Sequence, residues 1–267
     1  MHGRDHHGGV GVRRWAALAA IGCALAAGAL TLWPPAPAAA IGAASAIEIR
    51  ILQLKDGGGV PRPSAARRLA WAVRQRTSVE TALDPRTVQL GDAAMYDAPF
   101  LYWPGQRAFA PLSPAERRAL RRYIEFGGFL LIDDAAPDAS GFDVSVRREL
   151  AAIFGDGALH SLPGTHTIYR SFYLIDRPVG RVQGPGHIQA IERGGRAAVV
   201  FSRHDLGGAW ARDNLGNFLF QVVPGHSGQR ERAFRLGVNL VMYALCLDYK
   251  DDQVHAPFIM RRRAGQP

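Results

Sequence analysis

The stretch that decides the fold reads RRYIEFGGFLLIDD and covers residues 121–134. Its first half continues a helix that begins at Ser113-Pro114-Ala115-Glu116. There serine is the expected N-cap, proline takes the first helical position, and glutamate can complete a capping box. Gly127-Gly128 predicts the end of this helix, because glycine readily adopts the left-handed conformation of a C-cap. Residues 129–132 then form an apolar strand that leads directly into Asp133-Asp134.

Strand and helix patterns alternate along the rest of the chain. Strands are predicted over residues 46–54, near 86–90 and over 100–103, and a hairpin over 187–202 that turns at Arg193-Gly194-Gly195. Helices are predicted from Ser64, as N-cap, to about Arg76, from Asp143, as N-cap, to Phe154, and from about Gln229 to Leu247. This alternation requires crossover connections. It predicts an α/β fold with an open, mostly parallel sheet, helices on both faces and an added β-hairpin.

Composition narrows the class of protein. The chain has 267 residues and a formal net charge of +9, yet only Lys55 and Lys250 are lysines among its 32 basic residues. Such a bias towards arginine is typical of a genome's codon usage. The basic residues are not interleaved with aromatic residues, and no nucleic-acid-binding motif is visible. We therefore expect no nucleic-acid partner.

The N-terminal residues have the pattern of an export segment. Arg13-Arg14 precede an uncharged run over residues 15–33, and Ala38-Ala39-Ala40 offers a cleavage site. The run of 19 residues also suffices for a membrane anchor. Residues 1–40 are thus either a cleaved signal or an anchor in the inner membrane, and we expect a periplasmic protein. After cleavage only Cys246 remains, which excludes an internal disulfide and a cysteine-cluster metal site.

Five separated blocks carry a family resemblance. They are FLYWPGQ (100–106), RRYIEFGGFLLIDD (121–134), HTIYRSFYLI (166–175), VVFSRHDLGGAW (199–210) and RLGVNLVMYAL (235–245). Together they resemble the bacterial domain of unknown function family 4159, over roughly residues 46–247. The resemblance implies a glutamine-amidotransferase-like, flavodoxin-like domain, followed by a polar tail over residues 248–267. Similar proteins are often envelope-associated, some with transmembrane segments. Two departures are His166-Thr167, where His-Pro is usual, and Gly207-Gly208-Ala209-Trp210, which lacks an acidic residue before the tryptophan.

Ligands of open α/β sheets bind beyond the carboxyl ends of the strands, which places several polar residues near one edge. The candidate catalytic residues are Asp133, Asp134, His166 and Asp205. The candidate ligand-binding residues are Asp56, Trp103, Ser202 and Trp210. Carboxylates with an imidazole can bind a divalent metal or act as acid and base. Alternatively, the two adjacent aspartates only cap backbone amides. We predict that Asp134 points into the cleft and that Asp133 is structural.

Several other motifs predict less chemistry. An amidotransferase needs a thiolate, but Cys246 stands between two leucines of a predicted helix and is expected in the core. Gly225-His226-Ser227-Gly228 approaches a serine-hydrolase elbow, yet a helix cap explains Ser227 better. Gly57-Gly58-Gly59 lacks the Lys-Ser/Thr of a phosphate-binding loop and predicts a tight turn. Arginines 117, 118, 121 and 122 indicate a solvated helix face or contact with an anionic envelope polymer or membrane.

The sequence favours a non-catalytic or ligand-binding domain in a membrane-associated assembly. The alternative is a hydrolase that uses Asp133, Asp134 and His166, with a divalent metal as its only candidate cofactor. The two readings differ in geometry, because shared chemistry requires these side chains to converge within about 4 Å in an open cleft.

Overall fold

The computed structural model describes residues 46–57, 59–225 and 228–248. The strands are β1 (Ile49–Leu52), β2 (Thr87–Val88), β3 (Phe100–Gly105), β4 (Phe129–Asp134), β5 (His160–Ser161), β6 (Gln189–Arg193) and β7 (Arg196–Ser202). The α-helices are α2 (Ala65–Arg76), α3 (Pro114–Glu125), α4 (Gly141–Phe154), α5 (Leu206–Trp210) and α6 (Gln229–Asp248). Short 3-10 helices are η1 (Ala93–Asp97) and η2 (Thr167–Arg170).

The described strands form one seven-stranded sheet in the order β2-β1-β3-β4-β7-β6-β5. Neighbours from β2 to β7 pair in parallel, whereas β6 pairs antiparallel with both β7 and β5. The five parallel strands therefore follow the flavodoxin-like order 2-1-3-4-5, with β7 as the fifth. The predicted α/β class, the mostly parallel open sheet and the hairpin are confirmed.

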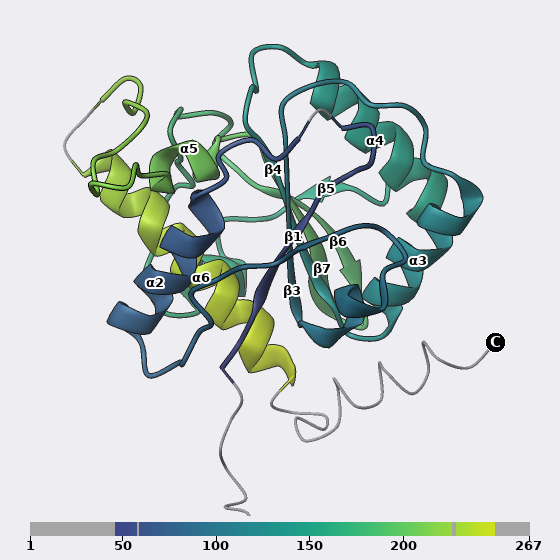
Figure 1. The fold of residues 1–267 in the computed structure, drawn as a ribbon, viewed down its shortest axis with the longest axis horizontal. Helices are drawn as coiled ribbons and strands as arrows, with labels where there is room; N and C mark the ends of the chain where they lie inside the picture. Colours follow the sequence, from purple (N-terminus) through teal and green to yellow (C-terminus); the bar gives the residue numbers. More distant parts are fainter. Residues whose placement is uncertain (1–45, 58, 226–227, 249–267) are drawn as a thin grey trace, which may run out of the picture. The chain divides into compact units, whose positions relative to one another are not determined.

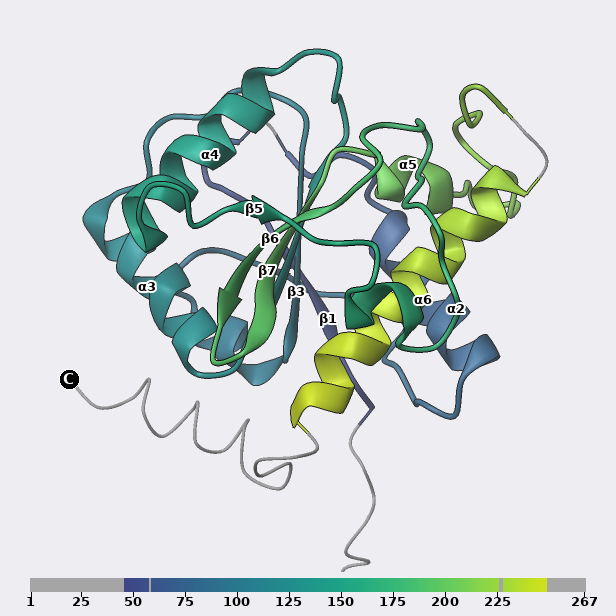
Figure 2. The same ribbon diagram turned by 180° about the vertical axis from the view of Figure 1, so that it is seen from behind.

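Helices cover both faces of this sheet, as predicted (Figures 1 and 2). On one face α2, α5 and α6 pack against one another, and their apolar side chains share a core with alternate residues of the central strands. On the other face α3 and α4 pack together over the remaining strand residues. Because side chains alternate along a strand, adjacent residues of β4 contribute to different cores.

The ends of α3 agree with the sequence prediction. The Ser113 hydroxyl accepts a hydrogen bond from the Glu116 backbone N–H, and the Glu116 carboxylate accepts one from the Ser113 N–H. This is the expected capping box. After Glu125 the chain turns at Gly127, whose φ of 98° lies in the left-handed region that glycine tolerates.

One predicted cap lacks its hydrogen bond, and another is misplaced. Ser64 occupies the N-cap position of α2 as predicted, but its hydroxyl donates to the Arg212 carbonyl oxygen at 2.8 Å and makes no cap bond. Asp143 lies in the first turn of α4, which begins at Gly141, and its carboxylate pairs with Arg147. In both cases a tertiary or charged partner competes with the backbone amides for the polar side chain. The sequence reading also missed α5, β5 and both 3-10 helices.

Some expectations fall outside the described residues. These are the export segment, Ser227, the tail from residue 249 and the packing of the Cys246 side chain. Among the residues that the structure does describe, no helix combines the length and the apolar character that crossing a bilayer requires.

Candidate functional site

Two regions at the carboxyl edge of the sheet hold the polar residues that the sequence singled out. The first, which we call the Asp133 cluster, consists of Arg62, Tyr102, Asp133, Arg181 and Asp205. The second, the β1–β3 crevice, lies beyond the ends of β1 and β3 and is lined mainly by residues 54–56, 90–91, 109–113 and 115–116. The two regions differ in burial and in how their charges are satisfied.

Asp133 is fully buried and fully engaged. Its Oδ1 accepts from the Leu206 backbone N–H at 2.9 Å, and its Oδ2 accepts from the Gly207 N–H at 2.8 Å. The Tyr102 hydroxyl donates to Oδ2 at 3.0 Å. These bonds fasten the start of α5 to β4. The structural role predicted for Asp133 thus agrees with its contacts.

Asp205 is the second buried carboxylate of the cluster, and it precedes α5 in a left-handed conformation with φ 48°. It accepts from the Gly208 N–H at 2.9 Å. Arg62 binds both of its oxygens, at 3.2 Å and 3.0 Å, and Arg181 forms a second ion pair with it. Asp205 is therefore a structural link between α5 and two loops.

Burial and the Asp205 charge raise the pKa of Asp133 to about 7, against the three hydrogen bonds that favour its carboxylate. The close packing around Asp133 and Asp205 also explains the two glycines of the GGAW block. A Cβ on Gly207 would collide with the Tyr102 hydroxyl, and one on Gly208 with the Asp205 carboxylate. These backbone and side-chain groups are therefore closely packed.

Asp134 points to the opposite face of the sheet, because the strand continues through it. Its Oδ1 accepts from the Ala136 N–H at 3.0 Å, while Oδ2 faces Arg203 Nε at 4.0 Å without a hydrogen bond. Burial raises the pKa of this carboxyl to about 6. The prediction that Asp134 opens into a cleft is wrong, since the residue is 0 % exposed. It fastens the turn after β4 instead.

His166 lies near the other end of the sheet. Its Nδ1 accepts from the Ile168 N–H at 3.2 Å, and its ring lies 5.6 Å from that of Tyr243. The Tyr243 hydroxyl in turn accepts from the N–H of Ala197, at the start of β7. Asp133 pairs with Ser202, five residues further along β7, or ~16 Å at strand rise. The structure does not bring His166 together with the two aspartates.

Three of the predicted ligand-binding residues are also buried. Trp103 packs against the rings of Phe109 and Phe142. The Ser202 hydroxyl accepts from the His204 N–H at 3.3 Å. Trp210 donates from Nε1 to the Ala233 carbonyl oxygen at 3.0 Å. Of the eight candidates, only Asp56 is exposed at a cavity.

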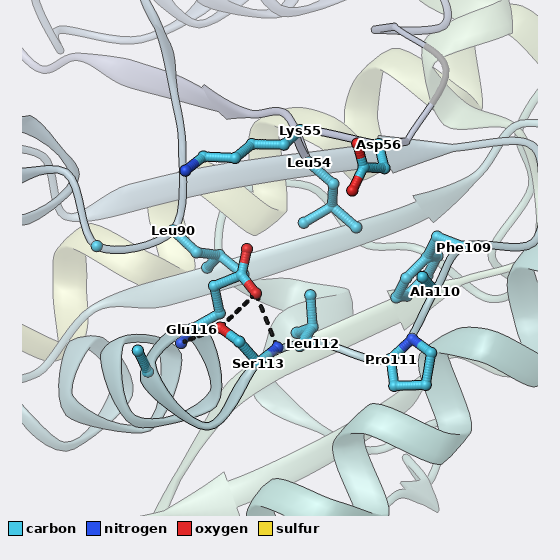
Figure 3. A pocket seen from close by; sticks show the side chains of 12 residues that line it. Leu54, Lys55, Asp56, Leu90, Phe109, Ala110, Pro111, Leu112, Ser113 and Glu116 are labelled. Carbon is cyan, nitrogen blue, oxygen red and sulfur yellow. Dashed lines mark hydrogen bonds between the residues drawn. The ribbon is translucent and has the colours of Figure 1, made fainter.

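The β1–β3 crevice contains that cavity, of about 440 Å³ (Figure 3). Apolar side chains form much of its lining, and Lys55, Asp56 and Glu116 bring charge to it. Glu116 uses Oε2 for both the Ser113 N–H and the Ser113 hydroxyl. Its other oxygen points away from Ser113 towards Leu54 and Leu90 (Figure 3).

Lys55 and Asp56 form neither a hydrogen bond nor an ion pair with a described residue, and both are exposed. Sequence reasoning found Asp56 but missed Lys55, Glu116 and the apolar lining. Two signals were present. Lys55 is one of only two lysines, and the capping-box motif fixes the position of Glu116 at the start of α3.

A metal centre has no support in this geometry. Within residues 46–57, 59–225 and 228–248, no group of three or more His, Cys, Asp or Glu side chains could hold a metal ion. In the Asp133 cluster, backbone amides, Tyr102 and arginines occupy the carboxylate oxygens.

The model of a family described as a domain of unknown function, DUF4159, matches residues 49–245. A search of curated proteins finds no match to the chain.

Proposed function

Because the chain belongs to the DUF4159 family, whose description names no reaction, we propose its function from its own geometry. The domain binds a small polar molecule in the β1–β3 crevice and is not catalytic. The observation that carries this proposal is an open cavity of about 440 Å³ at the point where the strand order reverses.

That position is the one at which open α/β sheets bind ligands. In the order 2-1-3-4-5, the connections from β1 and β3 leave towards opposite faces and open a crevice between their carboxyl ends. Leu54 to Asp56 follow β1 after Gln53, Leu90 and Gly91 follow β2, and Phe109 to Ser113 lie in the connection after β3. The volume falls within the range of about 300–1,000 Å³ that small-molecule sites occupy.

The lining indicates the class of ligand. The Lys55 ammonium can donate to a carboxylate, phosphate or hydroxyl group, and Asp56 and Glu116 can accept from ammonium or hydroxyl groups. Leu90, Phe109 and similar side chains offer apolar contact beside these charges. A small molecule with donors, acceptors and one apolar face fits this arrangement.

The geometry gives the alternative hydrolase little support. Asp133, Asp134 and Asp205 are buried and hold backbone, and His166 lies near the other end of β7. A catalytic carboxylate must reach the substrate or a water molecule beside it. A binding role in the open crevice requires no rearrangement of these groups.

We also propose that the scaffold is that of a glutamine amidotransferase without its reaction. The flavodoxin-like strand order supports the relationship. Amidotransfer needs a thiolate nucleophile where a strand leads towards a helix. At the end of β3 the chain continues with Gln106 and Arg107, which carry no thiol.

The export pattern of residues 1–40 supports a periplasmic location, in a membrane-associated assembly. A fusion of residues 1–46 to a reporter that is active only outside the cytoplasm tests this. A silent fusion would refute the location, and an exported but unshortened one would identify an anchor.

Binding is tested by thermal unfolding with a panel of amino acids, short peptides, sugars and nucleotides. A ligand that binds only the folded state stabilises it by about 2.7 kcal/mol at a hundredfold excess over Kd. Ala115→Trp should fill the crevice from the start of α3 and abolish the shift, whereas Ala139→Trp, exposed outside the crevice, should keep it. A shift of equal size in both variants would contradict the proposed site.

A further inference from the structure

The connection between α5 and α6 projects from the helical layer (Figure 1). Several of its apolar side chains are exposed. We call residues 212–223 the 212–223 loop. Leu215 is 87 % exposed, Val223 53 % and Leu219 49 %, and Phe218 is also exposed. Single exposed apolar residues are common on protein surfaces, but four within nine residues of one loop are not.

The loop is built to hold these side chains outward. Arg212 and Phe218 pair as an antiparallel bridge, which makes the start of the loop a small hairpin. At its tip Asp213 Oδ1 accepts from the N–H groups of Leu215 and Asn217, at 2.9 Å and 2.8 Å. These bonds fix the backbone on both sides of the tip, where Leu215 is exposed.

Arginines surround the base of the loop. Arg212 and Arg230 each stack on the Phe218 ring, 3.9 Å and 3.8 Å from its centroid. Arg68 donates to the Asp213 carbonyl oxygen at 3.3 Å. Arg212 and Arg230 likewise bind carbonyl oxygens, so none of these three guanidinium groups forms an ion pair with a carboxylate among the described residues.

The effect of this crowding is visible in the electrostatics. Burial and the charge of Arg68 lower the pKa of Arg212, and burial and the charge of Arg212 lower that of Arg230. An anion beside the loop would relieve this repulsion.

We propose that the 212–223 loop docks on the surface of an anionic lipid bilayer. Leu215, Leu219 and Val223 enter the boundary between headgroups and acyl chains, Phe218 lies at headgroup level, and the three arginines meet lipid phosphates. This inference goes beyond the proposed ligand binding and uses different residues.

A lipid surface fits the loop better than an acidic protein does. A specific protein interface buries about 800 Å² on each partner, more than four side chains on one narrow loop supply. A bilayer needs only protruding apolar groups and nearby positive charge. Each arginine near an anionic surface contributes about 1 kcal/mol, or a factor of about five in binding.

The test is co-sedimentation of residues 45–267 with vesicles of phosphatidylcholine alone or mixed with phosphatidylglycerol. The described strands and helices all lie within residues 45–267, which form one of the two compact units of the chain. Circular dichroism and a cooperative melt establish that it is folded. We expect binding to the mixed vesicles that weakens with salt, and little binding to phosphatidylcholine alone.

Variants separate the two parts of the proposal. Leu215→Asp should lower the bound fraction at least about tenfold, since a buried leucine contributes about 1.5–3 kcal/mol. Arg212→Gln should lower binding to the mixed vesicles about fivefold. Val144→Asp is the matched control, because Val144 is 62 % exposed but lies on α4. All variants should melt like the parent chain.

Three outcomes would overturn the proposal. One is no binding to the mixed vesicles, and another is equal binding to both kinds. The third is an equal loss in Val144→Asp and Leu215→Asp. If the parent chain instead forms dimers that Leu215→Asp dissociates, the loop contacts a second copy of the chain and not a membrane.

Discussion

The Asp133 cluster and the β1–β3 crevice occupy the same edge of one sheet, yet their charged side chains differ in burial and in pairing. In the cluster, Asp133 and Asp205 are 0 % exposed, and each accepts backbone N–H groups besides tyrosine or arginine donors. In the crevice, Lys55 and Asp56 are exposed and no described residue pairs with them. The more conspicuous acidic motif thus stabilises the fold, and the less conspicuous residues face open space.

The difference follows from what comes after each strand. The chain that follows β7 forms the short helix α5, whose free N–H groups need acceptors next to β4, and the two aspartates supply them. The chain that follows β1 turns at Lys55, and the side chains of Lys55 and Asp56 remain exposed beside the cavity. Position at the edge of a sheet therefore does not by itself give a side chain a functional role.

The largest expected effect on stability comes from replacing an aspartate by alanine in each of the two regions. Asp205→Ala should lower the free energy of unfolding by about 3–5 kcal/mol, because it leaves Arg62, Arg181 and the Gly208 N–H without their partner. Asp56→Ala should stay within about 0.5 kcal/mol of the parent chain. Urea unfolding of both variants measures the difference, and similar values for the two would break the comparison.

A pH series sharpens the comparison through His204. Its Nδ1 lies 2.8 Å from the Gln183 carbonyl oxygen and so carries the proton. Burial lowers the pKa of His204 from 6.5 to about 4. Between pH 6.5 and pH 4 this histidine is protonated in the unfolded chain but neutral in the folded one. Protonation therefore favours the unfolded chain, and the contribution of His204 to stability falls as pH falls. The loss should reach about 3 kcal/mol by pH 4.

The pH dependence of the parent chain alone does not isolate His204. The raised pKa values of Asp133 and Asp134 change stability with pH in the opposite direction, over an overlapping pH range. Their contributions decrease as pH rises from about 4 to 6 or 7. The difference in unfolding free energy between the parent chain and His204→Gln isolates the histidine. A difference that stays constant from pH 7 to pH 4 would show that His204 titrates normally.

The sequence predicted the fold well because its signals are local. The capping box at Ser113 and the left-handed Gly127 depend on neighbours within a few residues, and both are present. The cap bond predicted for Ser64 and the cap position predicted for Asp143 are wrong, because Arg212 and Arg147 compete for their side chains.

The site was harder to predict, because burial is a property of the whole fold. Asp133 and Asp134 look alike in sequence, but α5 covers one and the turn after β4 covers the other. In the sequence, only its residue type groups His166 with them. Its distance from them depends on pairing near the start of β7, which no local pattern reveals.

A smaller effect tests whether Asp133 is ionised when it accepts the hydrogen bond from Tyr102. Tyr102→Phe removes a hydrogen bond to a buried charged group and should cost about 1.5–3 kcal/mol at pH 8, where Asp133 is ionised. Tyr96→Phe removes a bond to the Ala119 carbonyl oxygen and should cost about 0.5–1.5 kcal/mol. Urea unfolding at pH 8 and pH 5 compares them. The Tyr102 loss should shrink at pH 5, and a loss that is independent of pH would show that the carboxyl does not ionise in this range.

The smallest effect on stability belongs to the crevice, where a change in binding should occur without a change in folding. Lys55→Ala removes an exposed ammonium that has no described partner, so the free energy of unfolding should change by less than about 0.5 kcal/mol. The same substitution should weaken any anionic or hydroxylated ligand found in the thermal panel, because one charge-assisted hydrogen bond contributes about 1.5–3 kcal/mol. Lys55→Arg keeps the charge but changes the shape of the donor, and should recover part of the affinity. Titration calorimetry of the three chains measures the affinities. If Lys55→Ala binds as tightly as the parent chain, the lysine is a solvated surface residue, and ligand binding in the crevice depends on Asp56, Glu116 and the apolar lining alone.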